Sequence, residues 1–181
     1  MLSRLFVVFV TLCAAASAHA GAWLQPAGKG LVIGQATYYT TAHYFDANGE
    51  LQRQPRFTKY EFQPYAEYGV LPNLTIGGTA YLDRVQQSGQ NHRGIADPEM
   101  FARTRLWSDD RQTLSLQPLI KLPGSFSKND VPRSGSRSTD AELSLLYGRS
   151  QPLLTSRDYI DTRVGYRVRN RGQSDQLRVD S

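Results

Sequence analysis

Charged side chains that could do chemistry recur at every second position over much of the chain. In residues 56–70, RFTKYEFQPYAEYGV, the charged Lys59, Glu61 and Glu67 alternate with aromatic and aliphatic residues. Guanidinium and carboxylate groups on neighbouring strands pair bidentately, so this spacing predicts a network of ion pairs on one face of a sheet. The positions that the alternation selects are Lys59, Glu61, Glu67, Asp97, Glu99, Arg103, Arg105, Asp140, Glu142, Asp161, Arg163 and Arg167.

Two interpretations of this network stay open. In the first, the ion pairs fill the lumen of a barrel and make it rigid. In the second, arginines without a partner create an electrostatic field that selects an anionic or polarisable solute. Both interpretations place the charges in the lumen, and neither requires that a covalent bond be made or broken.

The residues that most often carry out catalysis do not form a recognisable site. After residue 20 the histidines are His43, near the end of a predicted strand, and His92, in a polar segment. The Ser-Gly-Ser segment at 134–136 lacks the strand and helix that flank a nucleophile elbow. The aspartate pair at 109–110 is typical of a turn. Since the chain also lacks phosphate-loop, zinc and calcium motifs, we predict no enzymatic activity, no cofactor and no metal.

Residues 1–20, MLSRLFVVFVTLCAAASAHA, have the organisation of a secretory signal peptide. Arg4 supplies the positive charge, and residues 5–12 form an apolar core that is too short to span a bilayer as a helix. Small residues precede the expected cleavage site after Ala20. Cleavage there leaves a barrel domain over residues 21–181, which we expect to reach the outer membrane of a Gram-negative bacterium.

The rest of the chain is too polar for a helical membrane protein but suits a barrel. The mean hydropathy of all 181 residues is −0.46, and no apolar run after residue 20 is long enough for a transmembrane helix. Any membrane span must therefore consist of strands, in which every second residue is polar. The single cysteine, Cys13, lies in the signal peptide, so the mature chain has no thiol. The net charge of +5 comes from scattered arginines without a basic cluster, which excludes nucleic acid as a partner.

Long strands are predicted along the whole mature chain, with no helix between them. They are about ten to fourteen residues long, whereas strands of soluble proteins are usually near five or six and tilted membrane strands need about 9–11. Strand length therefore favours a membrane barrel. The alternation places the strands at about 31–44, 56–70, 74–85, 97–107, 112–122, 139–148 and 158–169, with an eighth beginning near 176.

Short and long connections alternate along the predicted sheet, as in barrels with tight periplasmic turns and long outer loops. The tight turns are 70–73 and 108–111. The links at 149–157 and 170–175 fit this rule less well. The long polar loops are predicted at 46–55, 86–96 and 123–138.

Aromatic residues on the apolar parity are expected to face lipid, where they form interfacial girdles. Trp107 and Phe101 instead lie on the polar parity, so either a bulge shifts the register there or some aromatic rings face the lumen. Pro98 has no backbone donor and predicts a bulge or a strand start. The expected lipid-facing aromatics are Tyr38, Tyr60, Phe62, Tyr68, Tyr147 and Tyr166.

Four groups of segments carry a family resemblance: EYGVLPNLTIG (67–77), GIADPE (94–99) with ARTRL (102–106), LSLQP (114–118) with KLPG (121–124), and DAEL (140–143) through Tyr147 and Gly148. Taken in order, these segments resemble a family of Gram-negative outer-membrane barrel transporters named after the meta-pathway of phenol degradation. The resemblance implies an outer-membrane barrel, passage of aromatic or other hydrophobic small molecules, and insertion by the barrel assembly machinery. Barrels of this kind end on a full strand with a terminal aromatic residue, whereas this sequence ends LRVDS, so we predict that it is truncated.

The sequence thus predicts an all-β protein, an antiparallel up-and-down transmembrane β-barrel with about eight strands in this chain, or a fragment of a larger barrel. The predicted function is a passive or weakly selective channel for small molecules, with membrane lipid and lipopolysaccharide as partners and a solute that the sequence does not identify. One alternative is a small eight-stranded barrel whose plugged interior serves a structural or surface-binding role. Another is a soluble periplasmic β-barrel or sandwich that binds a ligand.

Overall fold

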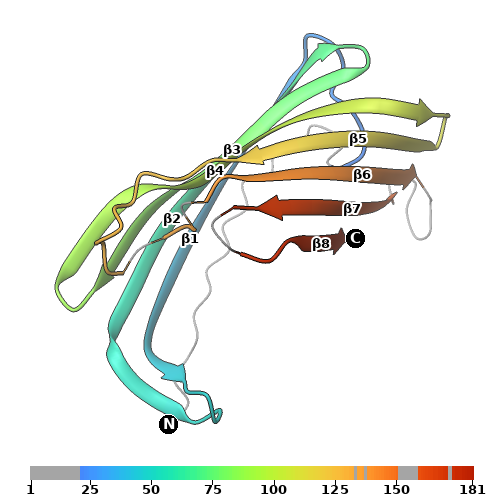
Figure 1. The fold of residues 1–181 in the computed structure, drawn as a ribbon. Helices are drawn as coiled ribbons and strands as arrows, with labels where there is room; N and C mark the ends of the chain where they lie inside the picture. Colours follow the sequence, from blue (N-terminus) through green and yellow to red (C-terminus); the bar gives the residue numbers. More distant parts are fainter. Residues whose placement is uncertain (1–20, 133, 137, 151–158, 171–172) are drawn as a thin grey trace.

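The chain forms one curved sheet of eight antiparallel strands. The computed structural model describes residues 21–132, 134–136, 138–150, 159–170 and 173–181. Each strand pairs with the next along the chain, in the order β1 to β8, and the sheet curls into a half-barrel (Figure 1). The predicted all-β, up-and-down architecture is therefore confirmed. The strands are β1 (Gly30–Phe45), β2 (Leu51–Leu71), β3 (Leu74–Gln87), β4 (Gln90–Ser108), β5 (Gln112–Lys121), β6 (Asp140–Ser150), β7 (Tyr159–Arg169) and β8 (Gln176–Asp180).

Two of the sequence predictions concern residues that the structure does not describe. The predicted signal peptide at 1–20 and most of the link at 149–157 lie outside the described residues. Within the described residues, no helix has the length and apolar character needed to cross a membrane.

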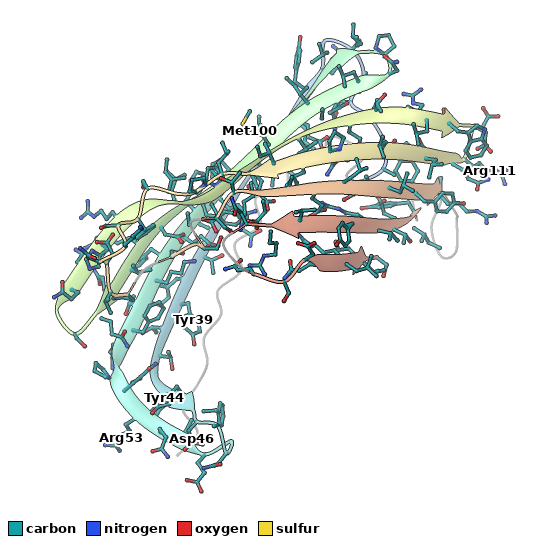
Figure 2. The ribbon with its side chains drawn as sticks, viewed as in Figure 1. Tyr39, Tyr44, Asp46, Arg53, Met100 and Arg111 are labelled. Atoms are coloured by element: carbon teal, nitrogen blue, oxygen red, sulfur yellow. The ribbon has the colours of Figure 1, made fainter. Side chains whose placement is uncertain are left out.

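The two faces of the sheet differ sharply, because side chains alternate across a strand. On β6, Asp140, Glu142 and Ser144 are buried on the concave face. The intervening Leu143 and Leu145 are 54% and 49% exposed on the convex face. Other strands repeat this arrangement, and Met100 projects from the convex side in Figure 2. The sheet therefore shows its apolar residues outward and keeps its polar residues inside.

The strand register keeps the apolar side chains together on the convex face. Tyr68 pairs with Ile76, and Ile76 pairs in turn with Ala102. Further along the sheet, Leu143 pairs with Tyr166, and Tyr166 with Leu177. A slip by one residue would turn a whole strand's apolar set to the other face, so the alternation itself specifies this register.

Two bulges in β4 account for Pro98 and Trp107, whereas Phe101 lies between the bulges. Thr79 pairs with Glu99 and Tyr81 with Ala96, so β4 carries an extra residue at 97–98, and Asp97 there has a φ of 31°. Of the two alternatives predicted at Pro98, a bulge or a strand start, the structure has the bulge, since β4 starts at Gln90. A second bulge lies between 105 and 107 and accompanies a Trp107 that is 50% exposed. Phe101, by contrast, lines a cavity on the concave face.

The tight turns at 70–73 and 108–111 are present, but the long loop predicted at 86–96 is wrong. There β3 continues to Gln87 and β4 starts at Gln90. Ser88 and Gly89, with φ of 52° and 79°, make the two-residue turn that suits a twisted hairpin. β2 also begins at Leu51, inside the predicted loop 46–55. These segments are polar on both faces, so they carry no alternation signal although their backbones are paired.

The turn between β1 and β2 is organised by Asp46. Its carboxylate accepts hydrogen bonds from the Asn48 and Glu50 amides at 3.0 and 2.9 Å and from Gln52 Nε2 at 2.9 Å. The bonds from Gln52 and from the Glu50 amide hold the pKa of Asp46 below its ordinary value. Figure 2 shows Asp46 at one end of the half-barrel and Arg111, in the β4–β5 turn, at the other.

Candidate functional site

The concave face carries the concentrated chemistry of this protein. Burial of a charged group is costly unless the group is paired and hydrogen-bonded. The partners of each buried charge therefore hold this face together. The buried polar and charged residues on this face include Glu67, Thr75, Asp83, Arg103, Thr113, Ser115, Gln117, Lys121, Asp140, Glu142, Ser144 and Arg167.

Arg103 is the centre of one cluster at the tight-turn end. Its Nη2 lies 2.9 Å from Glu67 Oε1, and its Nε donates to Gln117 Oε1 at 2.9 Å. Tyr65 Oη also donates to the Glu67 carboxylate. The guanidinium carbon of Arg103 lies 5.0 Å from the centre of the Phe101 ring, within the range of a cation–π contact. Arg103 is thus fixed on several sides.

Glu142 is the centre of a second cluster. Its carboxylate pairs with Arg167 Nε at 2.6 Å, with Arg178 Nη1 at 3.3 Å and with Arg163. Arg167 also reaches across to Glu99, with 3.0 Å between Nη2 and Oε1. One fully buried carboxylate therefore contacts three guanidinium groups from β7 and β8.

Two lysines hold further carboxylates toward the long-loop end. Lys121 Nζ lies 2.6 Å from Asp140 Oδ2 and 3.6 Å from Asp97 Oδ2. Lys59 Nζ lies 2.6 Å from Glu61 Oε2 and 3.0 Å from Asp83 Oδ2. Together with the arginine clusters, these pairs extend the network from β2 to β8.

The segment 21–29, which precedes β1, lies across the tight-turn end of the concave face. Ala22 is fully buried. Its N–H donates to both carboxylate oxygens of Asp161 at 3.2 and 3.1 Å, and its carbonyl accepts from Ser115 Oγ at 2.7 Å. The Trp23 carbonyl accepts from Arg103 Nη1 at 3.0 Å. Hydrogen bonds to the polar and charged side chains of the concave face therefore hold this segment in place.

Close backbone approach fixes both ends of this segment. A Cβ on Gly69 would lie 2.3 Å from the Pro26 carbonyl oxygen, and a Cβ on Gly148 would lie 2.3 Å from the Trp23 ring. Gly28 N also donates to the Gly69 carbonyl oxygen at 2.8 Å. Glycine is thus needed where the segment meets β2 and where it meets β6.

The long-loop end holds a small apolar cluster. Phe126, from the connection between β5 and β6, is 2% exposed and packs with Val85 and Ala96, and Phe57 and Tyr81 lie against them. The connection is held to β4 because Ser125 N donates to the Ile95 carbonyl and Ser125 Oγ accepts from the Ile95 amide, both at 2.8 Å. The apolar cluster thus occupies the end opposite segment 21–29.

Substitution of Gly124 by alanine is expected to detach this connection at a cost of about 1–3 kcal/mol in the free energy of unfolding. A Cβ there would lie 2.1 Å from the Ile95 carbonyl oxygen, so the backbone must move. Urea unfolding of the refolded protein and proteolysis within 122–139 measure the effect. Gly34→Ala is the control, because its nearest neighbours are Phe62 ring atoms at 3.3 and 3.4 Å. Equal stability and equal proteolysis of the two variants would contradict the close approach.

A cavity of about 410 Å³ lies on the concave face between these two ends. It is large enough for a small organic molecule, and it combines aromatic rings with charged groups, a composition suited to polar or aromatic solutes. Its lining includes Tyr65, Phe101, Arg103, Leu119, Tyr159 and Arg163.

The structure brings together eleven of the twelve charged residues that the spacing selected. Ten of them form the ion pairs described above, and Asp161 holds segment 21–29. Arg105 is placed differently: it is exposed and donates to the Pro72 carbonyl in the β2–β3 turn at 3.2 Å. Among the aromatics expected on the outside, Tyr38, Tyr60, Phe62, Tyr68 and Tyr166 are 42–52% exposed, and Tyr147 is half-buried and donates to Gln112.

Several contributors were not selected from the sequence. Lys121, Asp83 and Gln117 lie on the polar parity, so the alternation contained a signal for them. Trp23 and Phe126 lie outside the alternating segments, and only the folded chain shows their role. In the described ranges, no group of three or more histidine, cysteine, aspartate or glutamate side chains could hold a metal ion.

Comparison with known proteins leaves this arrangement to be interpreted from its own geometry. No family model, no curated protein and no solved structure matches the chain.

Proposed function

We propose that the chain forms the wall of an outer-membrane β-barrel, with its convex face in lipid and its concave face lining a lumen for small solutes. The observation that carries this proposal is the inverted arrangement of the sheet. Large apolar residues such as Val32 and Leu177 are 78% and 73% exposed, while Glu67, Arg103 and Glu142 are buried inside. A soluble sheet places its apolar face inward, whereas a membrane barrel does the reverse.

Strand length and connections support the same proposal. β2 and β4 have 21 and 19 residues, more than the roughly 9–11 that cross a bilayer, so their hairpins extend beyond it on the long-loop side. The tight turns gather at the other end, which is the periplasmic end in such barrels.

The lumen in this proposal is narrow and selective in its chemistry. Segment 21–29 limits it at the periplasmic end, and Phe126 limits it at the outer end. Between them lies the cavity that Arg103, Arg163 and the aromatic rings line. The carboxylates of Glu99, Asp161 and Asp180 line the same cavity. We propose that solutes pass passively and that this mixed lining favours small polar or aromatic molecules.

Planar-bilayer recordings of the full-length protein test the channel. Wild type is expected to give small unitary currents, and deletion of 22–27 is expected to increase them severalfold, because the deleted residues lie across the periplasmic end. Deletion of 47–49 in the exposed β1–β2 turn is the matched control and is expected to leave the conductance unchanged. Equal currents from both deletions would contradict a constriction by segment 21–29.

A second candidate function, that of a closed barrel, is favoured because segment 21–29 and Phe126 occupy the two ends of the concave face. If the ion pairs, segment 21–29 and Phe126 close the lumen, the protein is a structural or surface-binding barrel. Membrane-inserted, heat-modifiable protein without unitary current would support this second function. Recovery of the protein in the soluble periplasmic fraction without detergent would contradict both.

A further inference from the structure

Two arginines face each other on the convex side of the sheet, apart from the concave network. Arg84 of β3 and Arg93 of β4 are direct cross-strand partners. Arg93 is exposed, and Arg84 is half-buried. Like charges directly opposite each other destabilise a sheet, so a bound anion would relieve an unfavourable pairing.

The side-chain contacts of Arg84 are with neutral groups. Arg84 Nε donates to Asn91 Oδ1 at 3.2 Å, and the Gln86 amide lies 2.8 Å from Arg84 Nη2. Within the described part of the chain, no carboxylate forms an ion pair with Arg84 or Arg93. The concave arginines differ, since Arg103, Arg163 and Arg167 each have a carboxylate partner.

A shallow apolar groove of about 710 Å³ lies beside the two guanidinium groups. In register across the sheet, Tyr38 pairs with Tyr60, Tyr60 with Arg84, and Arg84 with Arg93. The rings of Tyr38 and Tyr60 are 5.0 Å apart. Aromatic and basic residues therefore share one row, which is the composition of a membrane–water interface. The apolar lining of the groove includes Ala36, Tyr38, Tyr60, Phe62, Leu82 and Ile95.

The position of this row along the strand matches the outer surface of a bilayer. Ile76 lies near the tight-turn end of β3, and Arg84 follows it by eight residues, or about 26 Å of strand. At the tilt usual in barrels, this is about 20 Å along the barrel axis, close to the apolar band of about 25 Å. The arginines thus lie at headgroup level on the long-loop side.

We propose that Arg84, Arg93 and the adjoining groove bind a phosphorylated glycolipid of the outer leaflet. This inference rests on the proposed membrane location. Guanidinium groups bind phosphate oxygens bidentately, so one lipid phosphate can lie across both arginines and remove their mutual repulsion. An acyl chain of the same lipid then lies in the groove against Phe62, Leu82 and Ile95.

Native mass spectrometry of the full-length protein, refolded in neutral detergent and titrated with bisphosphorylated lipid A, tests this site. The variant R84Q/R93Q is expected to bind at least tenfold more weakly than wild type. R53Q/R111Q removes two exposed arginine charges at the two ends of the half-barrel and is expected to stay within twofold of wild type. R93Q alone is expected to show an intermediate loss and serves if the double variant does not refold.

Further arms identify the source of the phosphate and separate this inference from the proposed function. Fully dephosphorylated lipid A is expected to bind weakly to wild type, and inorganic phosphate is expected not to compete at equal concentration. Competition by inorganic phosphate, or equal lipid binding by R84Q/R93Q and R53Q/R111Q, would overturn the glycolipid site. Heat-modifiable insertion of all variants into vesicles would leave the proposed function intact in that case, whereas failure of wild type to insert would remove both.

Discussion

Replacement of Glu142 by glutamine is expected to lower the free energy of unfolding by about 3–5 kcal/mol, because removal of one partner of a buried ion pair leaves the other charge uncompensated. The Glu142 side chain has no solvent exposure, and its partners Arg163, Arg167 and Arg178 are 23%, 8% and 35% exposed. Glutamine keeps the shape of the side chain and removes only its charge. Urea titration of the refolded protein in detergent, followed by tryptophan fluorescence, measures the change.

The control for this prediction is Glu50→Gln. Glu50 lies exposed in the β1–β2 turn, where a surface substitution is expected to change stability by less than about 0.5 kcal/mol. A double-mutant cycle with Arg167→Gln then isolates the coupling between Glu142 and Arg167. If E142Q and E50Q unfold at the same urea concentration, the Glu142 cluster does not stabilise the concave face.

Replacement of Leu145 by arginine is expected to cost about 2–4 kcal/mol in lipid vesicles, the penalty for a charge at the lipid-facing midplane of a barrel. Leu145 is 49% exposed and lies in the middle of the outward residues of β6. At an exposed position in water, the same substitution would change stability little. The free energy of unfolding from vesicles therefore reports whether the convex face meets lipid.

Leu51→Arg is the matched control, since Leu51 is 60% exposed at the start of β2, near the end of the half-barrel away from the tight turns. It is expected to leave the stability within about 0.5 kcal/mol of wild type. A loss for L145R that is no larger than that for L51R would show that Leu145 lies in water, and a membrane location for this face would have to be abandoned.

The strands could be predicted from the sequence because they are long and alternate strictly. β6 illustrates this, since its charged and apolar residues take opposite faces without exception from Asp140 to Leu145. The same signal selected most of the charged network, because a charge on the polar parity of a paired strand has only the concave face to occupy. Arg105 keeps this parity, since it pairs with Ser115, but it lies near the tight turns and donates to the Pro72 carbonyl without joining an ion pair among the described residues.

Two other features could not be predicted from the alternation of polar and apolar residues. The β3–β4 hairpin tip is polar on both faces, so the pairing of Gln87 with Gln90 leaves no trace in the hydropathy pattern. Phe126 is one aromatic residue in a polar loop, and its burial follows from a fold that brings Val85 and Ala96 to it. The alternation encodes neither arrangement, although the Ser88-Gly89 pair is itself a local turn signal.

The contacts that hold segment 21–29 on the concave face also bear on the order in which the protein folds. Ala22 is joined to Asp161, 139 residues later, and contacts of such long separation form slowly because the intervening chain must first be organised. Ala22 also needs Ser115 of β5 to be in place. We therefore expect Ala22 to reach its position late, after β5 and β7 have joined the sheet. A molecule stopped just before that step would have its strands paired and one end of its interior unsealed.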